Sequence, residues 1–139
     1  MKSKSLLLIA TFSTSMSFIC SYFFDLYMGN IEQYMALVGV LWIDGIFGII
    51  AGTKREGFQT RKAVHAIKRV IGWIMFLTVI LMIEKGFQGT AWLSETIMVP
   101  FLVLQIISAL KNASMAGFIK IEELNKILDR IDNHKGTRQ

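Results

Sequence analysis

Four apolar runs in the 139-residue sequence have lengths close to that of a membrane-spanning helix. A hydrocarbon core about 30 Å thick needs roughly 20 helical residues, and the runs lie at about 5–24, 31–52, 64–84 and 91–110. The third run includes Lys68 and Arg69 only if their charged groups extend to the membrane surface. The fourth contains Pro100, but neighbouring helices can satisfy the backbone acceptor that a proline leaves free. The sequence therefore predicts about four transmembrane helices.

The Lys and Arg residues are distributed unevenly around these runs. With residues 68 and 69 counted in the preceding loop, the five segments outside the runs carry 2, 0, 6, 1 and 6 of them in chain order. Short cytoplasmic loops carry an excess of Lys and Arg. The alternation therefore predicts four spans with both the N- and the C-terminus in the cytoplasm.

The composition favours helices embedded in lipid. Apolar residues make up 53% of the chain and charged residues 18%, and the mean hydropathy is +0.51, which is too apolar for a soluble domain. There is one proline, and no segment shows the apolar/polar alternation of a transmembrane strand. We therefore predict an all-α integral membrane protein with a single membrane domain over residues 1–139.

The two ends of the chain each have a feature of their own. The first run could be a secretory signal peptide with Lys2 and Lys4 before it, but no A-x-A cleavage site follows it and its length suits a span better. Residues 118–132 predict a short amphipathic helix, which could lie on the inner leaflet or pack against its copies. Its apolar stripe consists of Ile121, Leu124, Leu128 and Ile131.

Asp44 is the charged residue deep inside the second run. At about 1.5 Å per residue it lies roughly 12 Å from the cytoplasmic end of that span. A carboxylate at such depth costs a few kcal/mol, so it should face protein, water or a cation, and Lys68 and Arg69 are candidate partners. Two interpretations stay open: Asp44 ties helices together, or it lines a pore or responds to protons.

Small and hydroxyl-bearing residues on the first two runs are candidates for helix packing and oligomerisation. Small residues let two helices approach closely in lipid, and hydroxyls can form hydrogen bonds across helices or contact water in a lumen. On the second run they are Gly45, Gly48 and Gly52, the last two forming a GxxxG pair. On the first run Thr14, Ser17 and Ser21 share a face with Ala10.

The predicted cytoplasmic loop, residues 53–69, is strongly basic. It contains one acidic residue, Glu56, and its cations can set the membrane orientation and contact anionic lipid headgroups. These cations are Lys54, Arg55, Arg61, Lys62, Lys68 and Arg69.

No combination of residues in the sequence predicts catalysis. There is no Cys, His, Asp and Glu set with metal-ligand spacing, no Ser-His-Asp or Cys-His arrangement, and no phosphate loop. The net charge of +5 does not indicate a nucleic-acid partner, because the basic residues lie between or beyond the apolar runs rather than on one folded face. We expect neither an enzyme nor a cofactor or metal site.

Two segments resemble the phage holin family that includes the clostridial toxin-secretion holins. Residues 42–52, Trp-Ile-Asp-Gly-Ile-Phe-Gly-Ile-Ile-Ala-Gly, precede a basic loop with Thr60, as an Asp, an apolar residue and Gly precede a Lys-rich loop in the family. Ser108, Asn112 and Gly117 fit a later family element, followed by an amphipathic tail. Gln105 and Lys111 stand where that family usually has acidic residues.

This resemblance implies a function and its partners. Holins accumulate in the bacterial inner membrane, form homo-oligomers, and open holes that let an endolysin or a toxin pass. Two other functions remain open from the residues alone. One is a scaffold or accessory subunit of a secretion machine, and the other is a small proton- or cation-coupled transporter that uses Asp44.

Overall fold

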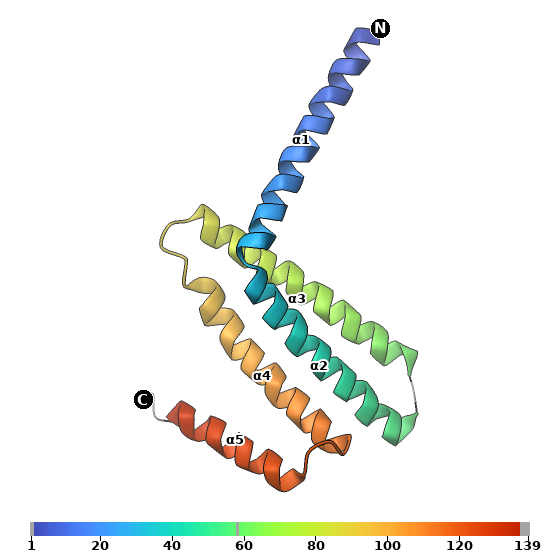
Figure 1. The fold of residues 1–139 in the computed structure, drawn as a ribbon, viewed down its shortest axis with the longest axis vertical. Coiled ribbons are helices and arrows are strands. Elements are labelled where there is room, and N and C mark those ends of the chain that lie inside the picture. Colours follow the sequence, from blue (N-terminus) through green and yellow to red (C-terminus); the bar gives the residue numbers. More distant parts are fainter. Residues whose placement is uncertain (1, 58, 137–139) are drawn as a thin grey trace. The chain divides into compact units, whose positions relative to one another are not determined.

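The computed structural model describes residues 2–57 and 59–136, and within these ranges the secondary structure is entirely helical (Figure 1). Four helices are long and apolar enough to cross a membrane, and a fifth is shorter. This confirms the predicted all-α fold with about four membrane-spanning helices and a short C-terminal helix. The helices are α1 (Lys2–Gly29), α2 (Ile31–Glu56), α3 (Thr60–Gly86), α4 (Leu93–Met115) and α5 (Ile121–Gly136).

The helices extend beyond most of the apolar runs. α2 continues to Glu56 and α3 begins at Thr60, so most of the basic segment 53–69 is helical and the link contains Gly57 with a φ of 81°. Only the fourth helix begins later than its run, at Leu93, because residues 91 and 92 form a turn. The helix bounds do not by themselves give the membrane boundaries, which stay predictions.

The chain divides into two compact units, residues 1–34 and 35–139. The first unit contains α1 and the start of α2. Asn30 ends α1 by donating from its side-chain amide to the carbonyl of Leu26 at 2.9 Å. Its own carbonyl then accepts the N–H groups of Gln33 and Tyr34 at the start of α2. The rings of Tyr27 and Tyr34 stack across this junction with centroids 4.4 Å apart.

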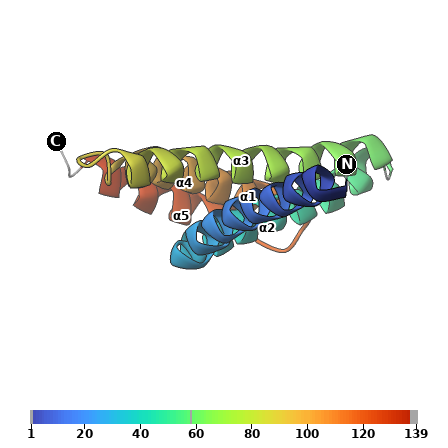
Figure 2. The same ribbon diagram turned by 90° about the horizontal axis from the view of Figure 1, so that it is seen from above.

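In the second unit, α2, α3 and α4 run alongside one another, and Figure 2 shows α3 lying over α2 and α4. Trp73 of α3 stacks on Phe101 of α4 with ring centroids 3.4 Å apart. The buried apolar side chains come from every helix of the unit: Leu37, Leu41, Ala51, Leu77, Ile80, Leu81, Met98, Ala109, Ala113 and Leu124.

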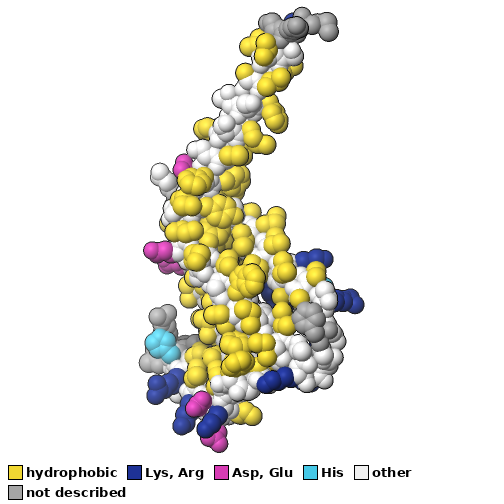
Figure 3. All heavy atoms as spheres, turned by 45° about the vertical axis from the view of Figure 1, so that its right-hand side comes forward, with side chains coloured by type: hydrophobic (Ala, Val, Ile, Leu, Met, Phe, Trp, Pro, Cys, Tyr) yellow, Lys and Arg dark blue, Asp and Glu magenta, His cyan; other side chains and the backbone are white. Residues whose placement is uncertain are grey.

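Much of the outer surface of this unit is apolar. Over α2 to α5, Figure 3 shows a broad hydrophobic face, with Lys and Arg gathered around the α2–α3 turn and α5. Large apolar side chains such as Ile71, Met75 and Leu104 are more than half exposed. Contiguous apolar surface of this extent is unusual on a soluble monomer and fits a protein whose solvent is lipid.

The turn between α3 and α4 is held by a carboxylate. Glu84 Oε1 accepts the backbone N–H of Ser94 at 2.6 Å, which satisfies one of the free donors at the N-terminus of α4. Gly89 has a φ of 99° and allows the chain to reverse. This contact joins the two helices at the end of the unit opposite to the α2–α3 turn.

Candidate functional site: a buried carboxylate that joins three helices

Asp44 is buried on α2, with 3% of its surface exposed. Its Oδ1 accepts hydrogen bonds from Ser108 Oγ at 2.8 Å and Asn112 Nδ2 at 2.9 Å, both on α4. Its Oδ2 accepts one from Arg69 Nη1 on α3 at 3.3 Å. We call these four residues the polar cluster. Through it a single carboxylate contacts two other helices.

The polar cluster confirms one of the two partners predicted for Asp44. Arg69 forms the ion pair, and its side chain remains 53% exposed, so it reaches toward the surface while it contacts the carboxylate. Lys68 is exposed and forms no ion pair within the described residues. The contacts with Ser108 and Asn112 were not predicted, although their spacing of four residues puts them on one face of α4.

The three glycines of α2 that were candidates for helix packing, Gly45, Gly48 and Gly52, face α3 and α4 of the same chain. A Cβ on Gly45 would lie 3.6 Å from Cβ of Ala66, and one on Gly48 would lie 3.4 Å from Nδ2 of Asn112. A Cβ on Gly52 would lie 3.8 Å from Lys62 Nζ. These glycines therefore lie at close contacts inside the unit, and their predicted role between copies of the chain stays a prediction.

Gly117 terminates α4. Its φ is 86°, its N–H donates to the backbone carbonyl of Ser114, and the N–H of Phe118 donates to the carbonyl of Ala113. This pair of bonds is the Schellman arrangement, in which glycine takes the left-handed conformation just after the helix. The carbonyl of Ala116 also accepts a hydrogen bond from Lys54 Nζ of α2. The sequence pattern places Lys54 only in the basic loop and does not predict this link.

The other cations around the α2–α3 turn differ in their contacts. Lys62 pairs with Glu56 at 2.8 Å, with both side chains about half exposed. Arg55, Arg61 and Lys68 are exposed and form no ion pair among the described residues.

A polar cavity of about 340 Å³ lies beside the polar cluster. Four of its lining residues are ionisable, namely Asp44, Lys62, His65 and Arg69. Ser108 and Asn112 add neutral donors from α4. Polar groups of α2, α3 and α4 therefore surround one hollow at the basic end of the unit.

The predicted hydroxyl face lies on α1, in the first unit. Thr14 Oγ1 donates to the carbonyl of Ala10 at 2.8 Å, and Ser17 Oγ to that of Ser13 at 2.9 Å. Ser21 is exposed. Because these donors are satisfied within the helix, the hydroxyls of Thr14 and Ser17 do not require a partner helix.

The polar partners of Asp44 are side chains of neighbouring helices. Among the residues that the structure describes, no group of three or more His, Cys, Asp or Glu could hold a metal ion. Asp44 instead collects three donors from two neighbouring helices. Within a membrane, where helix association lacks the hydrophobic drive, such contacts specify which helix faces pack together.

Comparison with known proteins identifies the family. The model of the bacteriophage holin family matches residues 19–133, which include all of α2, α3 and α4 and the whole polar cluster. No curated protein and no solved structure matches the chain. The family match covers well over half of the sequence and confirms the resemblance found in its motifs. Together with four helices able to span a membrane, it shows that this chain is a multi-pass membrane protein that belongs to the bacteriophage holin family.

Proposed function

We propose that this protein assembles into a homo-oligomeric hole in the bacterial inner membrane, through which an endolysin or a toxin leaves the cytoplasm. The observation that carries the proposal is the family match over residues 19–133. The four apolar helices and the extensive exposed apolar surface support it, because within a bilayer that surface can contact lipid or other copies of the chain.

The proposed orientation has both termini in the cytoplasm. The cations near Lys54, Lys62 and Lys111 lie at one end of the unit 35–139, where α2 and α4 end and α3 begins. At the other end, Glu84 near the end of α3 and Glu95 in the first turn of α4 lie with a single cation, Lys85. This difference follows the excess of cations in cytoplasmic loops. Reporter fusions at each terminus and in the α3–α4 turn test it, and a cytoplasmic signal from that turn would refute it.

The hydroxyl face of α1 has a proposed role in packing and oligomerisation. Internal hydrogen bonds at Thr14 and Ser17 let this face exist in lipid, while the hydroxyl oxygens can still accept bonds from water or another helix. A helix with these properties can leave lipid for an assembly without first breaking polar contacts to a partner.

The contacts of Asp44 support its role as a structural tie within this assembly. The accessory-subunit and transporter alternatives make different predictions for the variant Asp44→Ala, which removes all three acceptor contacts. A transporter would lose coupling yet still assemble, whereas a holin or a scaffold would lose assembly. Cross-linking in membranes, followed by gel analysis of oligomer size, separates the two outcomes.

The direct test of hole formation is induced expression in a bacterium, with membrane potential and lysis followed with and without a co-expressed endolysin. We expect abrupt depolarisation in both cultures and lysis only in the culture with endolysin. A chain that reaches the membrane, confirmed by fractionation, and leaves potential and growth unchanged would refute the proposal.

A further inference from the structure

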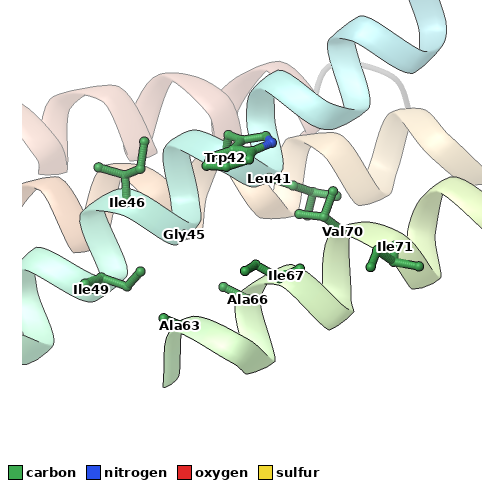
Figure 4. Close-up of a pocket in the computed structure, with 10 residues that line it drawn as sticks. All are labelled: Leu41, Trp42, Gly45, Ile46, Ile49, Ala63, Ala66, Ile67, Val70 and Ile71. Atoms are coloured by element: carbon green, nitrogen blue, oxygen red, sulfur yellow. The ribbon is translucent and has the colours of Figure 1, made fainter. Parts of the chain in front are cut away.

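An apolar groove runs between α2 and α3 on the outside of the unit 35–139 (Figure 4). It has a volume of about 340 Å³. Small residues meet between the two helices, where a Cβ on Gly45 would lie 3.6 Å from Cβ of Ala66. Bulky side chains beside this seam are about half exposed, including Trp42 at 55% and Ile67 at 55%. Every lining residue is apolar or glycine.

The length of the groove matches one half of a bilayer. Its lining runs from Leu41 to Ile49 on α2 and from Ala63 to Ile71 on α3. Eight helical residues rise about 12 Å, and half of a hydrocarbon core is about 15 Å thick. In the proposed orientation, the end at Ile49 and Ala63 is nearest to the cytoplasm. The groove therefore extends over the depth that acyl chains of the inner leaflet occupy.

A cation lies at the cytoplasmic end of this groove. Gly45, Ile49, Gly52 and Glu56 follow one another along the same side of α2, at spacings of four, three and four residues. Lys62 Nζ extends from α3 to this line, 3.8 Å from the position of a Cβ on Gly52 and 2.8 Å from Glu56 Oε2. The seam between the helices thus ends in an ammonium group.

Lys62 can bind an anion either beside Glu56 or in its place, with little loss of stability. An ammonium has three donors, and the contact with Glu56 uses one. That pair is about half exposed, so it contributes little to stability. Lys62 also lines the polar cavity with His65 and Arg69, and this cavity shares Gly45, Ile49 and Ala66 with the apolar groove. Cationic and apolar surfaces therefore meet along one seam.

We propose that this groove is a binding site for an anionic phospholipid of the inner leaflet, with one acyl chain between α2 and α3 and the phosphate at Lys62. An apolar chain fits the groove, and an anionic headgroup fits the cation at its surface end. An apolar helix face of a second copy would supply apolar contacts alone, whereas a phospholipid supplies both an acyl chain and a phosphate for Lys62. The proposal rests on the proposed orientation in the membrane and does not require that the protein opens a hole.

Trp42 makes the groove observable by fluorescence. The variant Trp73→Phe/Trp92→Phe retains Trp42 alone, because the chain has three tryptophans, and Phe preserves an aromatic ring against Phe101. The full-length variant is reconstituted in phosphatidylcholine vesicles that contain increasing fractions of brominated phosphatidylglycerol or brominated phosphatidylcholine. We expect half-maximal quenching of Trp42 at an about fivefold lower fraction of the anionic lipid, which corresponds to the ~1 kcal/mol gained by one Lys near anionic headgroups.

Two exposed cations provide a matched comparison. Lys62→Gln should abolish the preference for phosphatidylglycerol. Arg61→Gln removes the same charge from a neighbouring exposed residue that, unlike Lys62, does not line the polar cavity that adjoins the groove, and it should retain the preference. Glu56→Gln frees the ammonium and should strengthen the preference. Circular dichroism of each vesicle sample checks that the helices are intact.

Three results would overturn the proposal. Equal quenching by the two brominated lipids would mean that the groove holds lipid without regard to charge. Equal effects of Lys62→Gln and Arg61→Gln would mean that only the total charge of the turn matters. Absence of quenching by either lipid would mean that another copy covers Trp42. None of these results depends on depolarisation of cells, so failure of the lipid site and failure of hole formation can be distinguished.

Discussion

Replacement of Asp44 by Ala should destabilise the packing of α2 against α3 and α4. The carboxylate accepts three hydrogen bonds, two from α4 and one from Arg69. Single polar contacts between membrane helices contribute about 0.6 kcal/mol on average and about 1.7 kcal/mol at most. Because Arg69 is half exposed, its pair contributes no more than about 1 kcal/mol. The expected loss is therefore about 2–4 kcal/mol, or roughly 30- to 700-fold in the unfolding constant.

The variant Asp44→Asn refines this expectation. Its amide oxygen can still accept hydrogen bonds from Ser108 and Asn112, so it should lose mainly the pair with Arg69, about 1 kcal/mol. Unfolding of the purified protein by sodium dodecyl sulfate in mixed micelles, followed by circular dichroism, measures both losses. Asp129→Ala on α5 is the control, because this carboxylate is exposed and forms no ion pair among the described residues.

A double-mutant cycle tests whether these losses arise from the polar cluster. Asp44→Ala and Asn112→Ala should show a coupling free energy of about 0.6–1.7 kcal/mol. A coupling near zero would refute the structural tie, even if each single variant were destabilised. So would an Asp44→Ala protein as stable as the wild type, since the carboxylate would then be retained for a reason other than packing.

Three further predictions use the same unfolding assay. Gly48→Leu should lower the free energy of unfolding by about 1–3 kcal/mol by overpacking, because even a Cβ would lie 3.4 Å from the side-chain amide of Asn112 on α4. A Cβ on Gly39 meets nothing within 4 Å, so Gly39→Leu should be neutral or slightly stabilising; equal effects of the two variants would contradict the packing. Gly117→Ala should cost about 1–3 kcal/mol, since its φ of 86° strains any residue with a Cβ; an unchanged stability would mean that α4 ends differently. Glu84→Ala should cost about 1 kcal/mol by leaving the N–H of Ser94 unpaired, while Glu84→Gln retains an acceptor and should lose less; the reverse order would refute the cap.

The architecture could be predicted because lipid leaves few options. Apolar runs of about 20 residues can satisfy their backbone within a bilayer only as helices or closed barrels, and period-2 alternation is absent from the sequence. The apolar stripe that includes Leu124 and Leu128 predicted α5, because its residues recur at helical spacing. Helix ends were less predictable: the continuation of α2 to Glu56 lies in a charged segment where hydropathy gives no signal.

The polar cluster was predictable only in part. The cost of a carboxylate in a span required a partner for Asp44, and charge pointed to α3, so Arg69 could be named. Ser108 and Asn112 could be quoted as motif residues, but nothing in the sequence determines which neighbour the α4 face contacts. The link from Lys54 to Ala116 was not predictable, because every residue has a backbone carbonyl and the sequence does not indicate which one a lysine contacts.

At each end of the unit 35–139, charged side chains bind polar groups of a neighbouring helix. At the basic end, Asp44 accepts donors from α3 and α4, and Lys54 donates to the carbonyl of Ala116 just after α4. At the other end, Glu84 of α3 accepts a free N–H of α4. Between them lie apolar contacts that lipid could replace with little change in free energy, since lipid tails are as apolar as the side chains. The polar contacts therefore determine which faces of α2, α3 and α4 pack together, and apolar packing determines how closely they approach.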